Sequence, residues 1–467
     1  MVFDEKRIRV LDSCTYLHSI PLTTADDMVN MLDSTDFFKE PDLTITASEY
    51  INSHRVIDVS CKSGSLLFSF YKKFMVALRN VFPDRDDRDY FIVKNLLFGL
   101  CPNNMYLSTL RHTFYSNKKY NLSNELGNFY HYDFKDQFKR VSRDQIGVDS
   151  EEAKELLSKM KFDVVCGNPP YNNDMYLDFV MLGHRLAKSY DLWITPAKFI
   201  GMQNSNNTTF LSLFKETAIV AKYFTKATEI FNVQLDGGIV YYLMGKSNHS
   251  SIIINNISID STELVSFNIS LLKILHKINL VDSTSYNDTI FNICKSYFCS
   301  KQPTEVSQST GSGYYLINDR NRVEIDRTNL KHLDSFDNYK VFSVKVNDIP
   351  LVHILSPNEV YGRAAALLGY GDLSYCESLK SFFETKTIWY LVYFSGCGNI
   401  NTSTFRFVPN PGSFDKIYED KPLEGYTPDE NGIYTDNDGV VHCSLYVKYK
   451  LTDEEINVIE SVIRERK

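Results

Sequence analysis

Residues 168–171 read Asn-Pro-Pro-Tyr, and they place a side-chain amide, two rigid prolines and an aromatic ring in consecutive positions. Each proline fixes its own φ angle and favours an extended shape for the residue before it. The side chain of Asn168 and the carbonyls of Asn168 and Pro169 are therefore expected to point in preset directions. Together they form a set of acceptors for the hydrogens of a ligand amino group.

The chemistry that this arrangement favours is methylation of a planar amino group. Such an amine is a poor nucleophile because its lone pair is delocalised. Two fixed acceptors, the oxygen of Asn168 and the carbonyl of Pro169, can draw its two hydrogens out of the plane as charge develops. The ring of Tyr171 offers a flat face on which a base can stack. The alternative is an ordinary turn, since Asn and Pro are common in turns.

The elements around this tetrapeptide favour the functional interpretation over the turn. The apolar run at 162–166 predicts a buried strand of a parallel sheet, and ligands collect at the carboxyl ends of such strands. Alternation of apolar strands with helical patterns predicts helices on both faces of that sheet. Two apolar segments with little helix between them, 219–224 and 237–243, predict a closing antiparallel hairpin. The other predicted strands are 55–59, a run from 92 that ends at 99–101, 129–134 and 192–196, and the helices are 65–75 and 175–187.

The predicted strand at 55–59 leads into the small residues 60–64 and then into an amphipathic helix, as at the opening of a nucleotide-type site. In order along the chain, these motifs resemble adenine-specific DNA methyltransferases of the gamma arrangement, akin to the Eco57I-type restriction-modification methylases. The resemblance covers most of the chain. The segments that carry it are 20–22, 58–64, 99–103, 133–134, 168–171, 194–199 and 237–241.

The resemblance implies an α/β fold of the class I S-adenosylmethionine-dependent methyltransferases, which is Rossmann-like with a mostly parallel seven-stranded sheet and a closing antiparallel hairpin. A C-terminal mixed α+β target-recognition domain would follow. A length of 467 residues also predicts two domains. We expect a catalytic domain at 1–250 and the target-recognition domain at 251–467, with the boundary between 250 and 310.

The resemblance also implies site residues, with S-adenosylmethionine as the cofactor. The catalytic residues would be Asn168, Pro169, Pro170 and Tyr171, and the base pocket would be walled by Tyr171 and Phe199. The cofactor-binding residues would be Pro21, Asp58, Ser60, Cys61, Ser63, Gly64, Cys101, Asp133 and Phe134. No metal is expected, because the nine cysteines lack paired Cys-x-x-Cys spacing and no His-Glu-x-x-His pattern occurs.

Two residues depart from the family's pattern. Lys62 stands where the family has the first glycine of its cofactor loop, so it requires a negative φ or a side chain that turns outward. Cys101 stands where the family has an acidic residue for the cofactor ribose, which removes a charge-assisted hydrogen bond worth about 1.5–3 kcal/mol. These changes concern cofactor affinity and leave the catalytic tetrapeptide as the family has it.

In the second half, we expect helices with a stripe at 271–278, at 378–392 and after a capping box of Thr452 and Glu455, and strands at 339–344 and 405–409. Basic residues between 301 and 331 alternate with acidic ones, which fits a solvated mixed-charge face as well as a DNA contact. The net charge of −8 argues against a protein coated in positive charge, while a local basic groove remains compatible with it.

The implied function is a site-specific DNA adenine N6-methyltransferase that takes a flipped adenine from double-stranded DNA, as the modification component of a restriction-modification system. Too few residues precede 20–22 for a nuclease domain, so any restriction endonuclease is expected on a separate chain. No stretch approaches 18 uninterrupted apolar residues, so we expect no membrane and a cytoplasmic protein. One alternative is methylation of a protein glutamine or of RNA. Another is a DNA-binding or anti-restriction protein on a degenerate methylase scaffold, motivated by Lys62 and Cys101.

Overall fold

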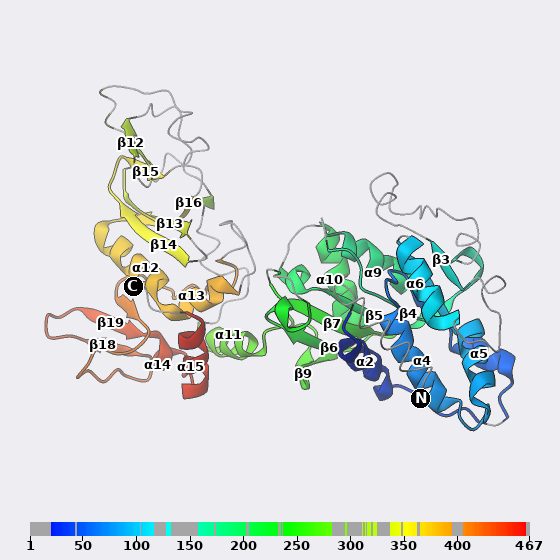
Figure 1. Ribbon diagram of the computed structural model, residues 1–467. Helices are drawn as coiled ribbons and strands as arrows, with labels where there is room; N and C mark the ends of the chain where they lie inside the picture. Colours follow the sequence, from blue (N-terminus) through cyan, green and yellow to red (C-terminus); the bar gives the residue numbers. More distant parts are fainter. Residues whose placement is uncertain are drawn as a thin grey trace. The chain divides into compact units, whose positions relative to one another are not determined.

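Figure 1 shows the computed structural model of the chain and how its elements follow one another. Two compact units divide the chain, Met1–Phe267 and Asn268–Lys467. The second is the part expected to recognise DNA targets, and that role stays a prediction. The residues that the structure describes are 20–42, 44–102, 104–115, 128–131, 157–171, 174–201, 205–231, 235, 237–282, 295–296, 311, 313, 315–318, 321–324, 337–346, 349–361, 365–394 and 405–463.

Within the described residues, unit 1 contains one nine-stranded sheet in the order β3-β2-β1-β4-β5-β7-β6-β8-β9. β1 to β5 pair in parallel, and β7 runs antiparallel between β5 and β6. This arrangement confirms the predicted Rossmann-like α/β fold with its closing antiparallel hairpin. The strands are β1 (Val56–Asp58), β2 (Leu97–Cys101), β3 (Phe129–His131), β4 (Phe162–Gly167), β5 (Ala187–Pro196), β6 (Ala218–Phe224), β7 (Ile239–Met244), β8 (Ser251–Ile254) and β9 (Ile257–Asp260).

The sheet has two strands beyond the seven predicted, because β8 and β9 extend it beyond β6. Asn255 and Asn256 have φ angles of 48° and 68°, and they form the two-residue turn between these strands. Asparagine tolerates this left-handed conformation better than most residues, so an Asn-Asn pair between Ile-rich runs is a hairpin signal. The change of composition near residue 250 therefore belongs to unit 1.

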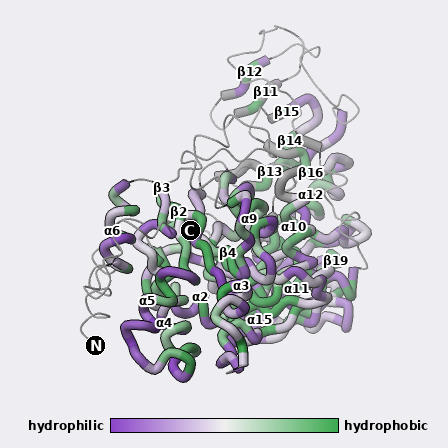
Figure 2. Tube along the Cα trace, turned by 90° about the vertical axis from the view of Figure 1, so that its right-hand side faces the viewer, coloured by the Kyte–Doolittle hydropathy of each residue, from purple (hydrophilic) through white to green (hydrophobic). Residues whose placement is uncertain are grey.

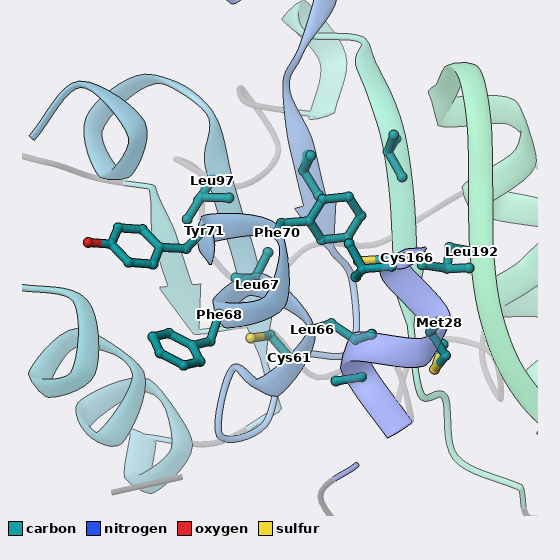
Figure 3. Packing of buried hydrophobic residues seen from close by; sticks show 14 of the residues in the cluster. Met28, Cys61, Leu66, Leu67, Phe68, Phe70, Tyr71, Leu97, Cys166 and Leu192 are labelled. Atoms are coloured by element: carbon teal, nitrogen blue, oxygen red, sulfur yellow. The ribbon is translucent and has the colours of Figure 1, made fainter. Parts of the chain in front are cut away.

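Helices cover both faces of the sheet, as the sequence predicts. On β4, Val164 and Cys166 join a hydrophobic cluster with α2 and α4, whereas Val165 faces Gly183 of α9. Figure 3 shows α4 packed beside Cys166 and Leu192 of the sheet. The helical elements of unit 1 are α2 (Leu22–Asn30), η2 (Met31–Ser34), α3 (Ala47–Ser53), α4 (Ser65–Ala77), α5 (Arg85–Asn95), α6 (Asn104–Tyr115), α9 (Met175–Leu186), η4 (Ala197–Gly201), α10 (Ser205–Thr217) and η5 (Ala227–Glu229).

The central strands are apolar over most of their length, which suits strands covered on both faces. Every residue of β2 and β4 is buried, and Figure 2 shows their tubes largely in the green of hydrophobic residues. The apolar run that begins at residue 92 was predicted to lead along a strand to 99–101. Instead, α5 continues to Asn95, and the strand begins at Leu97. The Asp84 side chain caps the start of this helix by accepting the Asp87 N–H.

Unit 2 contains three small sheets among the described residues, with strand orders β10-β16-β13-β14, β12-β11-β15 and β17-β19-β18. Its helices are α11 (Ile269–Val281), α12 (Leu373–Glu384), α13 (Lys386–Tyr393), α14 (Leu445–Lys448) and α15 (Asp453–Val462). Its strands are β10 (Lys295–Ser296), β11 (Tyr315–Asn318), β12 (Asn321–Glu324), β13 (Tyr339–Val346), β14 (Ile349–Leu355), β15 (Glu359–Tyr361), β16 (Ala365–Gly371), β17 (Ile417–Glu419), β18 (Ile433–Thr435) and β19 (Val441–Ser444).

Several predictions for unit 2 are confirmed and two are wrong. The helix with its stripe at 271–278, the strand at 339–344 and the capping box of Thr452 and Glu455 are present. The helix predicted at 378–392 is interrupted at Thr385, whose side chain accepts the Ile388 N–H and starts a second helix. Residues 405–409 form a turn instead of a strand. No helix in the described part of the chain is long and apolar enough to cross a membrane.

Candidate functional site

The candidate site lies at the carboxyl ends of β1 and β4, which are neighbours in the sheet. Asp58 ends β1 and pairs in register with Cys166 of β4, two residues before Asn168. Ligands bind at this edge in open α/β sheets. The structure therefore brings the predicted cofactor loop and the predicted catalytic tetrapeptide together. One pocket is lined by both segments, through Ile20, Asp58, Ser60, Lys62, Ser63, Gly64, Ser65, Leu66 and Asn168.

Gly64 shapes the loop side of this pocket. Its φ angle is +90°, a conformation that side chains rarely tolerate, and α4 begins directly after it. A Cβ at this position would also lie 2.5 Å from Cδ1 of Leu110 on α6. The first turn of α4 leaves backbone N–H groups without intrahelical partners, and this end of the helix carries partial positive charge. The pocket thus has a wall suited to an anionic or polar ligand group.

Asp58 provides a buried acceptor in the pocket. Its side chain accepts the Ser60 N–H at 3.0 Å. Burial raises the pKa of Asp58 to about 7, although the Ser60 N–H and the charge of Lys62 act in the opposite direction. The Ser60 hydroxyl is buried as well and has no hydrogen-bond partner among the described residues. Because buried polar groups are rarely left unpaired, Asp58 and Ser60 form a donor and acceptor set that fits the polar amino-acid part of S-adenosylmethionine.

Gly167 links the two halves of the site. A Cβ at Gly167 would lie 2.5 Å from the Ser60 hydroxyl and 3.0 Å from the Trp193 ring. Only glycine leaves enough room for β4 to approach the loop this closely. The backbone that leads into Asn168 therefore lies close to both Ser60 of the predicted cofactor loop and the ring of Trp193.

Trp193 is held in place by a hydrogen-bonded series of side chains, His184, Asp191 and Trp193 itself. The sequence did not predict these residues as part of the site. The Nε1 of Trp193 donates to Asp191 Oδ2 at 3.0 Å, and His184 Nδ1 lies 2.9 Å from Asp191 Oδ1. Burial raises the pKa of Asp191, and the hydrogen bonds from His184 and Trp193 oppose that shift. The ring fills the space beside Gly183, where a Cβ would lie 2.1 Å from it. The sequence offered one signal of this contact, which is a glycine inside a predicted helix, Gly183, followed by a tryptophan in the next predicted strand, Trp193.

The tetrapeptide itself is largely enclosed. Asn168 is 7% exposed and lines the pocket, and Pro169 is buried. Tyr171 packs its ring against the hydrophobic cluster of α4, and its buried hydroxyl has no hydrogen-bond partner among the described residues. Burial raises the pKa of Tyr171, so the phenol stays neutral. Tyr171 is not among the described residues that line the pocket, so its predicted stacking role stays a prediction.

Three cysteines lie near the pocket but stay in the core. Cys61, Cys101 and Cys166 are fully buried free thiols. Burial raises the pKa of Cys61, and a side-chain hydrogen bond with Cys101 adds to that effect. The thiol of Cys101 thus adjoins the cofactor loop, yet Cys101 is not among the described residues that line the pocket. The structure does not bring Cys101 to the ligand side, and its predicted ribose-binding role remains a prediction.

The remaining predicted residues lie apart from the pocket lining. Phe199 is fully buried, with its ring centroid 4.8 Å from that of Phe210 and 5.3 Å from that of Phe214, so it packs among aromatic rings. Pro21 caps α2 and adjoins Ile20, which lines the pocket. Asp133 and Phe134 lie outside the described residues. No cluster of described residues could hold a metal ion.

Comparisons with known proteins give only distant likenesses. No protein-family model and no curated protein matches the chain. Among solved structures, the chain is similar to the type I restriction enzyme EcoKI M protein, with 13% identity over 47% of this chain and 46% of that chain, and a TM-score of 0.31. It is also similar to the type IIL restriction-modification enzyme MmeI in complex with DNA, with 11% identity over 85% of this chain and 65% of that chain, and a TM-score of 0.41.

A third likeness is to magnesium protoporphyrin IX methyltransferase from Synechocystis PCC 6803 with bound SAM, with 10% identity over 48% of this chain and 79% of that chain, and a TM-score of 0.26. The match covers less than half the length of the EcoKI subunit. At identities of 10–13% and TM-scores of 0.26–0.41, these likenesses carry no information about the activity, substrate or partners of this chain.

Proposed function

We propose that this chain is an S-adenosylmethionine-dependent methyltransferase that modifies the exocyclic amine of adenine in double-stranded DNA. The observation that carries the proposal is one pocket lined both by Asn168 of the Asn-Pro-Pro-Tyr segment and by the loop from Asp58 to Gly64. A ligand held by the loop would lie next to a substrate held by Asn168. Closeness of the two reactants is the main requirement of a transfer reaction.

When bound, S-adenosylmethionine supplies the electrophilic methyl group. In this proposal, Asp58, Ser60 and the first turn of α4 bind the amino-acid part of the cofactor. The oxygen of Asn168 and the carbonyl of Pro169 accept the two hydrogens of the substrate amine and so direct its lone pair toward the cofactor. These interactions strengthen as positive charge develops on the nitrogen, which makes them stronger in the transition state than in the ground state. Tyr171 stacks on the base that carries the amine.

Adenine in duplex DNA is the substrate that the tetrapeptide and the length of unit 2 favour. The target base would leave the duplex to reach Asn168, because an amine inside the stack cannot approach the end of β4. Modification within a restriction-modification system, with any endonuclease on another chain, is part of the same proposal. A protein glutamine or an RNA base presents the same kind of amino group, so these substrates are the competing candidates within the same reaction class.

The direct test exposes unmodified genomic DNA to the purified full chain and S-adenosylmethionine, followed by sequencing that detects modified bases. We expect N6-methyladenine at one recurring sequence. Unmodified DNA together with calorimetric binding of S-adenosylmethionine would redirect the search to protein or RNA substrates. Absence of cofactor binding at millimolar concentration would favour a DNA-binding or anti-restriction role on a degenerate scaffold.

A further inference from the structure

Lys62 departs from the glycine that related cofactor loops carry, and the structure shows how it is accommodated. The φ angle of Lys62 lies outside the left-handed region, so the backbone does not require glycine at this position. Lys62 is one of the residues that line the pocket, and its charge is close enough to the buried Asp58 carboxyl to act on the pKa of that group. A lysine in such a place adds a positive charge to the ligand side.

The pocket carries one charge of each sign. Among the described residues that line it, Lys62 is the single cation and Asp58 the single anion, and the others are hydroxyl, amide, glycine or aliphatic residues. The two charges sense each other, since the charge of Lys62 acts to lower the pKa of the buried Asp58 carboxyl. A pair of opposite charges beside a helix N-terminus is complementary to an α-amino acid, which carries an ammonium group and a carboxylate on one carbon.

We propose that Lys62 binds the carboxylate of the cofactor's methionyl group while Asp58 accepts its ammonium group. The inference rests on the proposed function, because it takes S-adenosylmethionine as the ligand of this pocket. It gives Lys62 a binding role that a glycine in the same loop position cannot have. Lys62 then increases the affinity for the cofactor. The departure from the family's glycine alone suggests the opposite, a loss of affinity.

The charges of the ligands make the proposal testable. Near neutral pH, S-adenosylmethionine carries a net charge of about +1, from a sulfonium, an ammonium group and a carboxylate. A lysine that did not reach the carboxylate would repel this cation, and would repel neutral S-adenosylhomocysteine less. A lysine that binds the carboxylate increases the binding affinity of both ligands. Neither effect depends on methyl transfer, so the two cases can be separated by binding alone.

The experiment is calorimetry on the full chain with three ligands: S-adenosylmethionine, S-adenosylhomocysteine and methylthioadenosine, which lacks the amino-acid group. For Lys62→Met we expect binding of the first two to weaken by about tenfold or more, the loss typical of a charge-assisted hydrogen bond. Binding of methylthioadenosine should stay within about twofold, which also shows that the pocket is intact. Lys62→Arg should retain most of the affinity. The matched control is Lys39→Met, at an exposed lysine outside the pocket lining.

Equal losses for all three ligands would overturn the proposal, because methylthioadenosine has no carboxylate to lose. Tighter binding of S-adenosylmethionine to Lys62→Met would overturn it too, since the lysine would then act only by repulsion. If the unmodified chain binds methylthioadenosine and S-adenosylmethionine while Lys62→Met binds both equally well, the inference fails and the proposed function stands. If the unmodified chain binds none of the three ligands, the proposed cofactor and the role of Lys62 fail together.

Discussion

Replacement of Asn168 should affect turnover much more than cofactor affinity. The Asn168 side chain would act on the amine only while charge develops in the transition state, so Asn168→Ala should lower turnover by orders of magnitude. Cofactor affinity should change much less than turnover, because the groups proposed to bind the amino-acid part of the cofactor are Asp58 and Ser60, which are joined by the Ser60 N–H to Asp58 hydrogen bond. Turnover of labelled methyl groups and calorimetry measure the two effects. Turnover above about a tenth of normal would exclude the catalytic role.

Asp58 gives the site a pH dependence whose direction follows from burial. Its pKa is raised to about 7, above the value of about 4 in an unfolded chain. The stability contributed by the protonated group is present below about pH 4 and is lost as pH rises through about 7. Cofactor binding should follow the opposite direction, since an ammonium group requires the ionised carboxylate.

We therefore predict that binding of S-adenosylmethionine weakens by about fourfold between pH 8 and pH 6, because the ionised fraction of Asp58 falls about tenfold while the protonated fraction of the cofactor's α-amino group rises about 2.5-fold. Calorimetry at the two pH values measures this change. In Asp58→Asn the affinity should be lower at pH 8 and should not fall between pH 8 and pH 6. An unmodified chain whose affinity is the same at both pH values would show that Asp58 does not bind the ammonium group.

At the scale of elements, the contact of α9 with β5 supports the end of β4. Alanine usually stabilises a helix relative to glycine by about 0.5–1 kcal/mol. In Gly183→Ala the new Cβ would lie 2.1 Å from the ring of Trp193, and forcing such an overlap apart costs about 1–3 kcal/mol. We expect net destabilisation of about 1–2 kcal/mol. Chemical denaturation measures it, with Arg185→Ala, at an exposed position of α9, as the control. Stabilisation by Gly183→Ala would show that Trp193 can move without cost.

The elements that follow from local residue patterns could be predicted from the sequence. The features that depend on contacts between distant segments could not. The strand at 162–166 and the helix after Gly64 were predictable because buried strands and amphipathic helices leave clear apolar patterns. The beginning of β2 was misplaced because an apolar helix end and a buried strand look alike without neighbours. The support of Gly167 by Trp193 could not be predicted, since it depends on packing between β4, β5 and α9. The place of Lys62 in the pocket lining likewise could not be predicted, since it depends on the backbone conformation of the loop.

At the scale of the whole molecule, the division between Phe267 and Asn268 separates the candidate site from unit 2. Every described residue that lines the pocket belongs to unit 1. The last part of unit 1 is needed for its core, because Phe267 packs against two buried phenylalanines. The centroid of its ring lies 5.5 Å from that of Phe199 and 5.6 Å from that of Phe214. A separate unit 1 should therefore end after Phe267, which lies within the range of 250–310 predicted for the boundary.

We predict that residues 1–267 alone fold and bind S-adenosylmethionine with nearly the affinity of the full chain, yet lose sequence-specific methylation of DNA. Base reading is separate from chemistry in proteins that recognise DNA, and unit 2 is the part proposed to read the target. Circular dichroism and calorimetry check folding and cofactor binding before DNA is added. Sequencing for modified bases then compares the truncated and full chains. Methylation at the same recurring sequence by residues 1–267 would refute the recognition role of unit 2 and would place base reading in the catalytic unit.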